Sequence, residues 1–153
     1  VAVGLASAGS LQLLQLVTNV SLPCSEVLGV GTPADACVRV VHAQPDLPQA
    51  DIAIAGNAVA QGLAFGQASA FLPVPAVEDV EISAAPAGQP AAGGVQQVTL
   101  EAGQAYEAVI YSDSGVATPD PVAAGVRFVL ASVDITPLPA DQARVRLIHG
   151  AAD

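Results

Sequence analysis

The sequence predicts an all-β chain: an antiparallel β-sandwich of the immunoglobulin-like kind, preceded by an apolar N-terminal extension. In the middle of the chain, short runs rich in β-branched residues alternate with turn residues, as in sandwiches and barrels. The 14 Gly and 12 Pro residues indicate many turns. No connecting segment has the length and period of a crossover helix, which argues against a parallel α/β sheet.

Seven or eight strands are expected, and seven can be given ranges. The first covers residues 37–43 and ends before a Pro-Asp turn. The second covers residues 51–55, alternates Ile52 with Ile54 and stops at Gly56. The remaining five strands are expected over residues 69–74, 77–84, 96–100, 105–111 and 126–133.

The strand expected over residues 77–84 has the clearest alternation. Val80 and Ile82 should face the core, and Asp79, Glu81 and Ser83 should face solvent. Asp79 and Glu81 would then share a face that could bind calcium weakly. A solvated outer face is the favoured interpretation of these acids.

Composition and charge limit the function. Aromatic residues make up only 3% of the chain, so aliphatic side chains must fill the core. Fourteen acids face four arginines and no lysine, giving a net charge of −10. This charge argues against nucleic acid and against docking on anionic lipid. It indicates a surface that keeps an apolar chain soluble, or alternatively one suited to a cationic partner or to calcium.

The two cysteines, Cys24 and Cys37, are expected to form a disulfide. Their spacing matches no zinc motif, and one Cys pair with distant histidines does not make a convincing four-ligand site. A disulfide would place the protein in an oxidising compartment, outside the cell or at its surface. The alternative is a pair of inert buried thiols.

The chain divides into an apolar extension (1–36), a sandwich domain (37–142) and a short terminal piece (143–153). Residues 14–22 carry no charge and alternate apolar side chains onto one face, as in a strand buried on one side; a short amphipathic helix is the alternative. Such a segment needs a partner surface, in its own chain or in another. The segment's apolar residues, expected to take part in assembly, are Leu14, Leu16, Val20 and Leu22.

An internal repeat joins the start of the domain to the end of the chain. Residues 39–46 return as residues 146–153, at an offset of 107, with the frame Arg-x-x-His-x-x-x-Asp unchanged. Val145, which directly precedes the second copy, and Leu147 within it need a partner, as a lone strand cannot bury them. The frame residues, interpreted as a structural turn, are Arg39, His42, Asp46, Arg146, His149 and Asp153.

Five motifs occur together, in order: residues 38–46 (VRVVHAQPD), 50–54 (ADIAI), 63–69 (LAFGQAS), 72–75 (LPVP) and 100–106 (LEAGQAY). This set resembles the family called domain of unknown function 4397, over about residues 36–153. The resemblance implies a β-sandwich found in tandem copies in secreted and surface proteins, mostly of bacteria. It implies no activity.

No constellation of residues indicates catalysis, a cofactor or a tightly bound metal. His42 could serve as a base or metal ligand, but the favoured interpretation is that it bonds the carboxylate of Asp46 and holds the turn. Asn19 begins a glycosylation sequon, a pattern that is common by chance.

The sequence therefore predicts a non-enzymatic extracellular structural protein. It would self-associate into a surface fibre or filament by exchange of terminal strands, with no nucleic acid partner and no membrane insertion. The alternative is a ligand-binding or adhesive module of a tandem-domain surface protein, which would bind through the loops 86–94 and 112–125.

Overall fold

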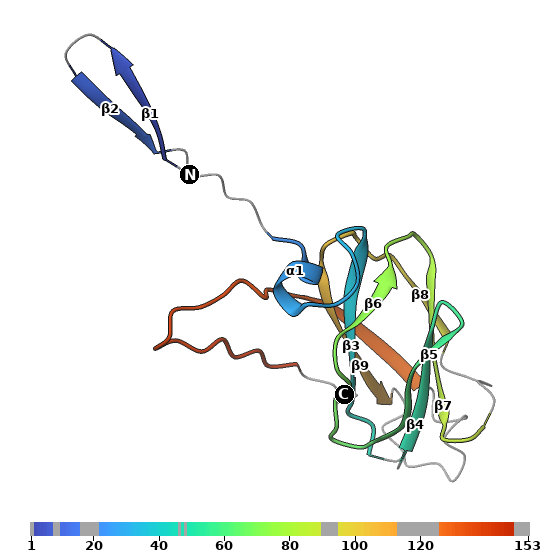
Figure 1. Ribbon diagram of the computed structural model, residues 1–153. Helices are drawn as coiled ribbons and strands as arrows, with labels where there is room; N and C mark the ends of the chain where they lie inside the picture. The colour runs from blue at the N-terminus through green and yellow to red at the C-terminus, as the bar shows by residue number, and fades with distance from the viewer. Residues whose placement is uncertain are drawn as a thin grey trace.

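Two four-stranded sheets face each other in the computed structural model, with a short helix at one end (Figure 1). The structure describes residues 2–7, 10–15, 22–45, 47, 49–89, 95–112 and 126–148; for residues 2–7, 10–15 and 112 the description is limited to the backbone. The predicted all-β sandwich is confirmed.

The first sheet has the strand order β10-β9-β3-β6. β3 pairs antiparallel with β6 but parallel with β9, so one ladder departs from a purely antiparallel sheet. Pro73 and Pro75 stand in β6, which is an edge strand and therefore tolerates missing N–H groups. The strands are β3 (Asp35–His42), β6 (Leu72–Pro75), β9 (Ala105–Ser112) and β10 (Val126–Val133).

The second sheet has the order β5-β4-β7-β8. A tight turn at Ala55 and Gly56, with φ of 51° and 74°, connects β4 to β5. Two left-handed residues in succession match the turn type that favours the twist of a hairpin. The strands are β4 (Gln49–Ile54), β5 (Asn57–Ala64), β7 (Val80–Pro86) and β8 (Val95–Val98).

The strand expected over residues 77–84 begins later than predicted. Asp79 has a φ of 55°, which interrupts an extended backbone, so β7 starts at Val80. Val80 and Ile82 are buried and Glu81 is exposed, as the alternation predicted. The prediction that Ser83 faces solvent is wrong, because this central strand between β4 and β8 is buried on both faces from Ile82 to Ala85.

Aliphatic side chains of both sheets fill the core, as the low aromatic content requires. Tyr106 is the one tyrosine in the cluster, and its hydroxyl accepts a hydrogen bond from the Glu101 N–H at 3.1 Å. The largest fully buried apolar side chains are Leu47, Ile52, Ile54, Ile82, Ile110, Val38 and Val40.

A carboxylate ties β4 to its neighbours. Asp51 Oδ1 accepts a hydrogen bond from the Gly62 N–H and Oδ2 from the Gly88 N–H, each at 2.7 Å. These bonds, first that from Gly88, hold the pKa of Asp51 below its ordinary value. Gly62 lies where the register of β4 and β5 shifts, so the carboxylate supports an irregularity in the ladder.

Near the N-terminus, β1 (Ala2–Ser7) and β2 (Ser10–Gln15) form an antiparallel hairpin. Leu14 lies in β2, opposite Val3. Leu16 and Val20 lie outside the described residues. Leu22 belongs to no strand and is half exposed, so the strand expected across residues 14–22 does not extend to Leu22.

Candidate interaction site

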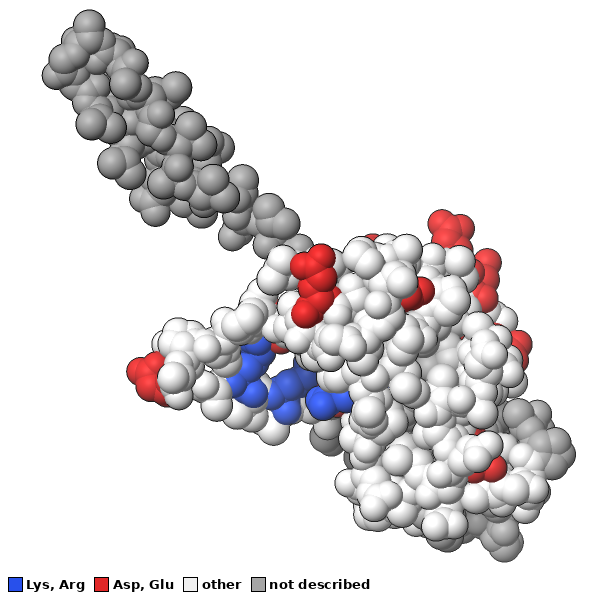
Figure 2. All heavy atoms as spheres, in the orientation of Figure 1, with Lys and Arg blue, Asp and Glu red and all other residues white. Residues whose placement is uncertain are grey.

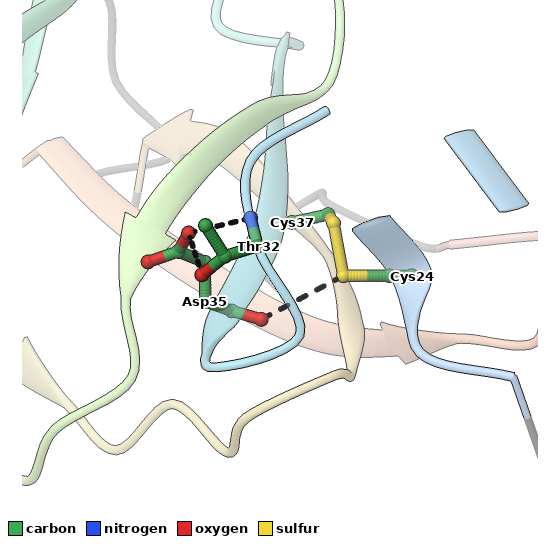
Figure 3. The surroundings of a disulfide bond; sticks show 4 residues. All are labelled: Cys24, Thr32, Asp35 and Cys37. Carbon is green, nitrogen blue, oxygen red and sulfur yellow. Dashed lines mark hydrogen bonds between the residues drawn. A yellow bond between two sulfur atoms is a disulfide. The ribbon is translucent and has the colours of Figure 1, made fainter. Parts of the chain in front are cut away.

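The disulfide predicted from the sequence is present and lies at one end of the sandwich. Cys24 opens helix α1 (Cys24–Leu28), and its sulfur is bonded to that of Cys37 on β3 (Figure 3). Both residues are fully buried. Around them a second apolar cluster forms, comprising Ala105 and the partly buried Leu28, Val30, Phe71, Val133 and Ile135.

A short loop holds α1 against the first sheet. Asp35 Oδ2 accepts hydrogen bonds from both the N–H and the hydroxyl of Thr32, at 2.8 Å each (Figure 3). The loop also passes close to β6, because a Cβ on Gly31 would lie 2.4 Å from Pro73 Cβ. Cys24 Sγ lies 3.9 Å from the Asp35 carbonyl oxygen, a contact without a hydrogen bond since a disulfide sulfur carries no proton.

A groove of about 500 Å³ runs between α1 and the chain that follows β10. One wall comes from the segment before and within α1, the other from residues 132–137, and the floor from the β8–β9 connection. The lining is mostly apolar: Leu22, Pro23, Val27, Pro33, Ala102, Gly103, Ala105, Val133, Ile135 and Pro137, with Gln104, Ser132, Asp134 and Thr136.

Among the described strands, β10 leaves one edge of its sheet open. It is last in the strand order, and β9 is the described strand with which it pairs. Residues 134–148 continue from it, run outward and return toward the sandwich (Figure 1). Ser132, Asp134 and Thr136 stand two residues apart in the chain that ends β10 and continues beyond it.

Arginine side chains from the returning segment bind these carbonyl oxygens. Arg144 Nη1 donates to the carbonyl of Asp134 at 2.7 Å and to that of Thr136 at 3.3 Å. Arg146 Nη2 donates to the carbonyl of Ser132. Cationic side chains gather in this region, between the returning segment and the body of the molecule, in the view of Figure 2.

Asp134 strengthens the contact with the returning segment. Its carboxylate pairs with Arg144 at 2.9 Å, in an exposed position. Hydrogen bonds from Thr136, first from its hydroxyl and then from its N–H, and the charge of Arg144 hold the pKa of Asp134 below its ordinary value. The carboxylate therefore stays ionised and available to a guanidinium at neutral pH.

The returning segment leads into the second copy of the repeat, of which residues 146–148 are described. Val145 is 81% exposed and Leu147 is 93% exposed, and residues 142–148 belong to neither sheet. At the offset of 107 they correspond to Val38 and Val40 of β3, each 1% exposed. The same aliphatic pattern is thus buried in one copy and open to solvent in the other.

The repeated arginines have different partners. Arg39 on β3 forms an ion pair with Glu107 on β9 at 2.9 Å, and its guanidinium lies 5.1 Å from the centroid of Phe71. Its counterpart Arg146 binds a carbonyl of the open edge instead. The remaining frame residues of the second copy, His149 and Asp153, lie outside the described residues.

His42 is fully buried at the end of β3. Its Nδ1 accepts a hydrogen bond from the Gln44 N–H at 3.3 Å, while Nε2 has no partner of good geometry among the described residues. Burial lowers the pKa of His42, and a backbone hydrogen bond with Leu47 acts in the opposite direction without cancelling it. Asp46, expected as its partner, lies outside the described residues, so that pairing stays a prediction. The described residues contain no group of three or more potential metal ligands.

The sequence indicated the two cysteines and the exposed aliphatic residues of this region. It did not indicate the wall of the groove that residues 132–137 form. No sequence motif includes Ser132, Asp134 and Thr136. The one sequence signal that could have indicated them is the nearby pair of Arg144 and Arg146, which stand two residues apart. The loops suggested for ligand binding, 86–94 and 112–125, are described only at residues 86–89 and at 112. No described helix has the length and apolar character needed to cross a membrane.

Comparison with known proteins agrees with the motifs. Among curated proteins, none matches this chain. The sequence model of the family described as "Domain of unknown function (DUF4397)" matches residues 36–153, which is most of the chain and all of the sandwich except the first residue of β3. The protein therefore belongs to the family of domain of unknown function 4397.

Proposed function

We propose that this protein is a non-enzymatic structural module of an extracellular surface assembly. It associates with further copies of the same fold through the segment 143–148, and repeated association of this kind builds a fibre or filament. The buried disulfide supports an oxidising location. The burial of His42, whose imidazole contacts Gln44 and is closed to solvent, supports a structural role for this residue.

The exposure of Val145 and Leu147 carries the proposal. Burying an aliphatic side chain of this size contributes about 1.5–3 kcal/mol, and here that contribution is not realised. Arginine side chains attach the segment 143–148 to the chain that follows β10, and the backbone of the segment pairs with no described strand. A partner that offers a sheet edge would satisfy the backbone and bury both aliphatics, which is the mode of β-strand addition.

Sedimentation velocity over a range of concentrations tests the proposal. The protein should form species larger than the monomer in increasing amount, and the double variant Val145→Asp/Leu147→Asp should stay monomeric. Val77→Asp/Val95→Asp is the matched control, because these valines are also exposed, at 53% and 52%, but lie elsewhere. This control should associate as the unmodified protein does. A monomer at every concentration would refute the proposed association.

A further inference from the structure

We infer that the groove between α1 and residues 132–137 receives the segment 143–148 of a second copy of the chain, which adds as a strand to the open edge of β10. This inference rests on the proposed association and names the surface that accepts the segment. Three properties of the groove support it: an unpaired backbone edge, an apolar lining and a matching charge.

The backbone edge is the first property. The carbonyls of Ser132, Asp134 and Thr136 accept hydrogen bonds from arginine side chains of the segment 143–148, not from a neighbouring strand. An incoming strand presents N–H groups at alternate residues and can donate them to carbonyls of this edge. It would therefore replace the side-chain contacts with a backbone ladder.

The apolar lining is the second property. Val27, Val133 and Ile135 stand half-buried around the groove, and Leu22 is half exposed beside them. A volume of about 500 Å³ is in the range of small-ligand pockets and is sufficient for a pair of aliphatic side chains. Val145 and Leu147 of an added strand lie on one face, because side chains alternate along a strand.

Charge is the third property. Arg144 already pairs with Asp134, so the segment and the edge recognise each other within one chain. In that arrangement only the arginines engage the edge, and Val145 and Leu147 remain in water. Exchange between two chains keeps an arginine partner for the carboxylate of Asp134 and moves the aliphatics out of water, so the exchanged form is favoured at high concentration.

The segment 143–148 does not fit the position of β3 in the first sheet of another copy, although its sequence resembles that of β3. At the offset of 107, Arg144 falls at the position of Cys37, which is fully buried and bonded to Cys24. Burying an unpaired guanidinium there would be strongly unfavourable. The open edge of β10 imposes no such burial, since Arg144 remains exposed beside it.

Two complementary kinds of variant, groove-blocked and donor-blocked, test the acceptor groove. Ala102→Trp fills the groove from an exposed position without removing a buried side chain, and Val27→Glu is a second way to block it. Val145→Asp/Leu147→Asp removes the donor. Each variant alone should be monomeric. An equimolar mixture of the groove-blocked and donor-blocked chains should form a heterodimer and nothing larger, because one chain then lacks an acceptor and the other lacks a donor.

Native mass spectrometry distinguishes the variants by mass, and circular dichroism checks that each is folded. Ala58→Trp, an exposed alanine on β5 of the other sheet, is the control and should associate normally. If both groove-blocked variants associate like the unmodified protein while the donor-blocked variant does not, the acceptor assignment is overturned and the role of the segment stands. A mixture that stays monomeric also overturns the assignment. If the unmodified protein is itself monomeric, the proposed function fails first.

Discussion

Removal of the disulfide should lower the free energy of unfolding by about 3 kcal/mol. The bond joins residues 13 apart, and the chain-entropy relation for a loop of this length gives about 3 kcal/mol at 25 °C. Cys24→Ala/Cys37→Ala is the suitable change, because both positions are fully buried and alanine leaves no polar atom there. The lost cross-link then dominates the effect.

Urea unfolding followed by circular dichroism measures this loss. The double variant should unfold at lower urea, and its thermal midpoint should fall by roughly 10 °C for a domain of this size. Reductant should move the curve of the unmodified protein onto that of the variant and leave the variant unchanged. Two reactive thiols in the denatured, unreduced protein would refute the reasoning, as would a loss below about 1 kcal/mol.

The loss should begin at α1. This helix has five residues and no side-chain cap at Pro23, so it is too short to be stable alone. The Cys24 N–H donates to the Gly103 carbonyl at 2.7 Å. In the double variant this amide should exchange with solvent well before the amides of β3 and β9, which a hydrogen-exchange measurement can resolve.

Two further changes test the interior. The pKa of His42 is lower in the folded state than in the unfolded state, so below about pH 6.5 the unfolded chain binds a proton that the folded chain does not. The contribution of neutral His42 to the free energy of unfolding should therefore be complete above this pH. Below it, the free energy of unfolding should fall by up to about 1.4 kcal/mol per pH unit. His42→Gln should flatten this part of a stability-versus-pH curve, and an unchanged slope would contradict the assignment. Arg39→Ala should reduce stability by about 1–3 kcal/mol, because it leaves the buried carboxylate of Glu107 without its partner. Arg39→Ala/Glu107→Ala should lose less than the sum of the single changes; additive losses would show that the pair is not coupled.

The strands that sequence reasoning found are those with β-branched alternation, and those it missed lack it. β5 reads NAVAQGLA, with a single β-branched residue and only Leu63 fully buried, so neither pattern nor propensity marks it as a strand. Helix α1 completes little more than one turn, too little for a period of 3.6 to be visible. Residue 69 was expected to begin a strand, but the Ser69 hydroxyl accepts the Val40 N–H in place of a strand backbone.

Only one half of the candidate site, the segment 143–148, could be predicted from the sequence, and the reason is geometric. The repeat and the exposed aliphatics of residues 143–148 are properties of one continuous segment. The groove comes from three segments, residues 22–33, 102–105 and 132–137, which the fold brings together. The parallel pairing of β3 with β9 was likewise hidden, because a ladder between distant strands leaves no local pattern.

That parallel ladder has a consequence for the order in which the chain can fold. Arg39 and Glu107, paired across it, are 68 residues apart, so β3 leaves the ribosome long before its central neighbour exists. Contacts between residues so far apart in the sequence slow folding, and they leave the apolar strand β3 without its partner until β9 has been synthesised. The bond between Cys24 and Cys37 needs only the chain around it and can close early. Once this bond is closed, it fixes β3 beside α1, ready to pair with β9. The later segment 143–148 has Arg144 at the position of Cys37 and therefore competes poorly for pairing with β9.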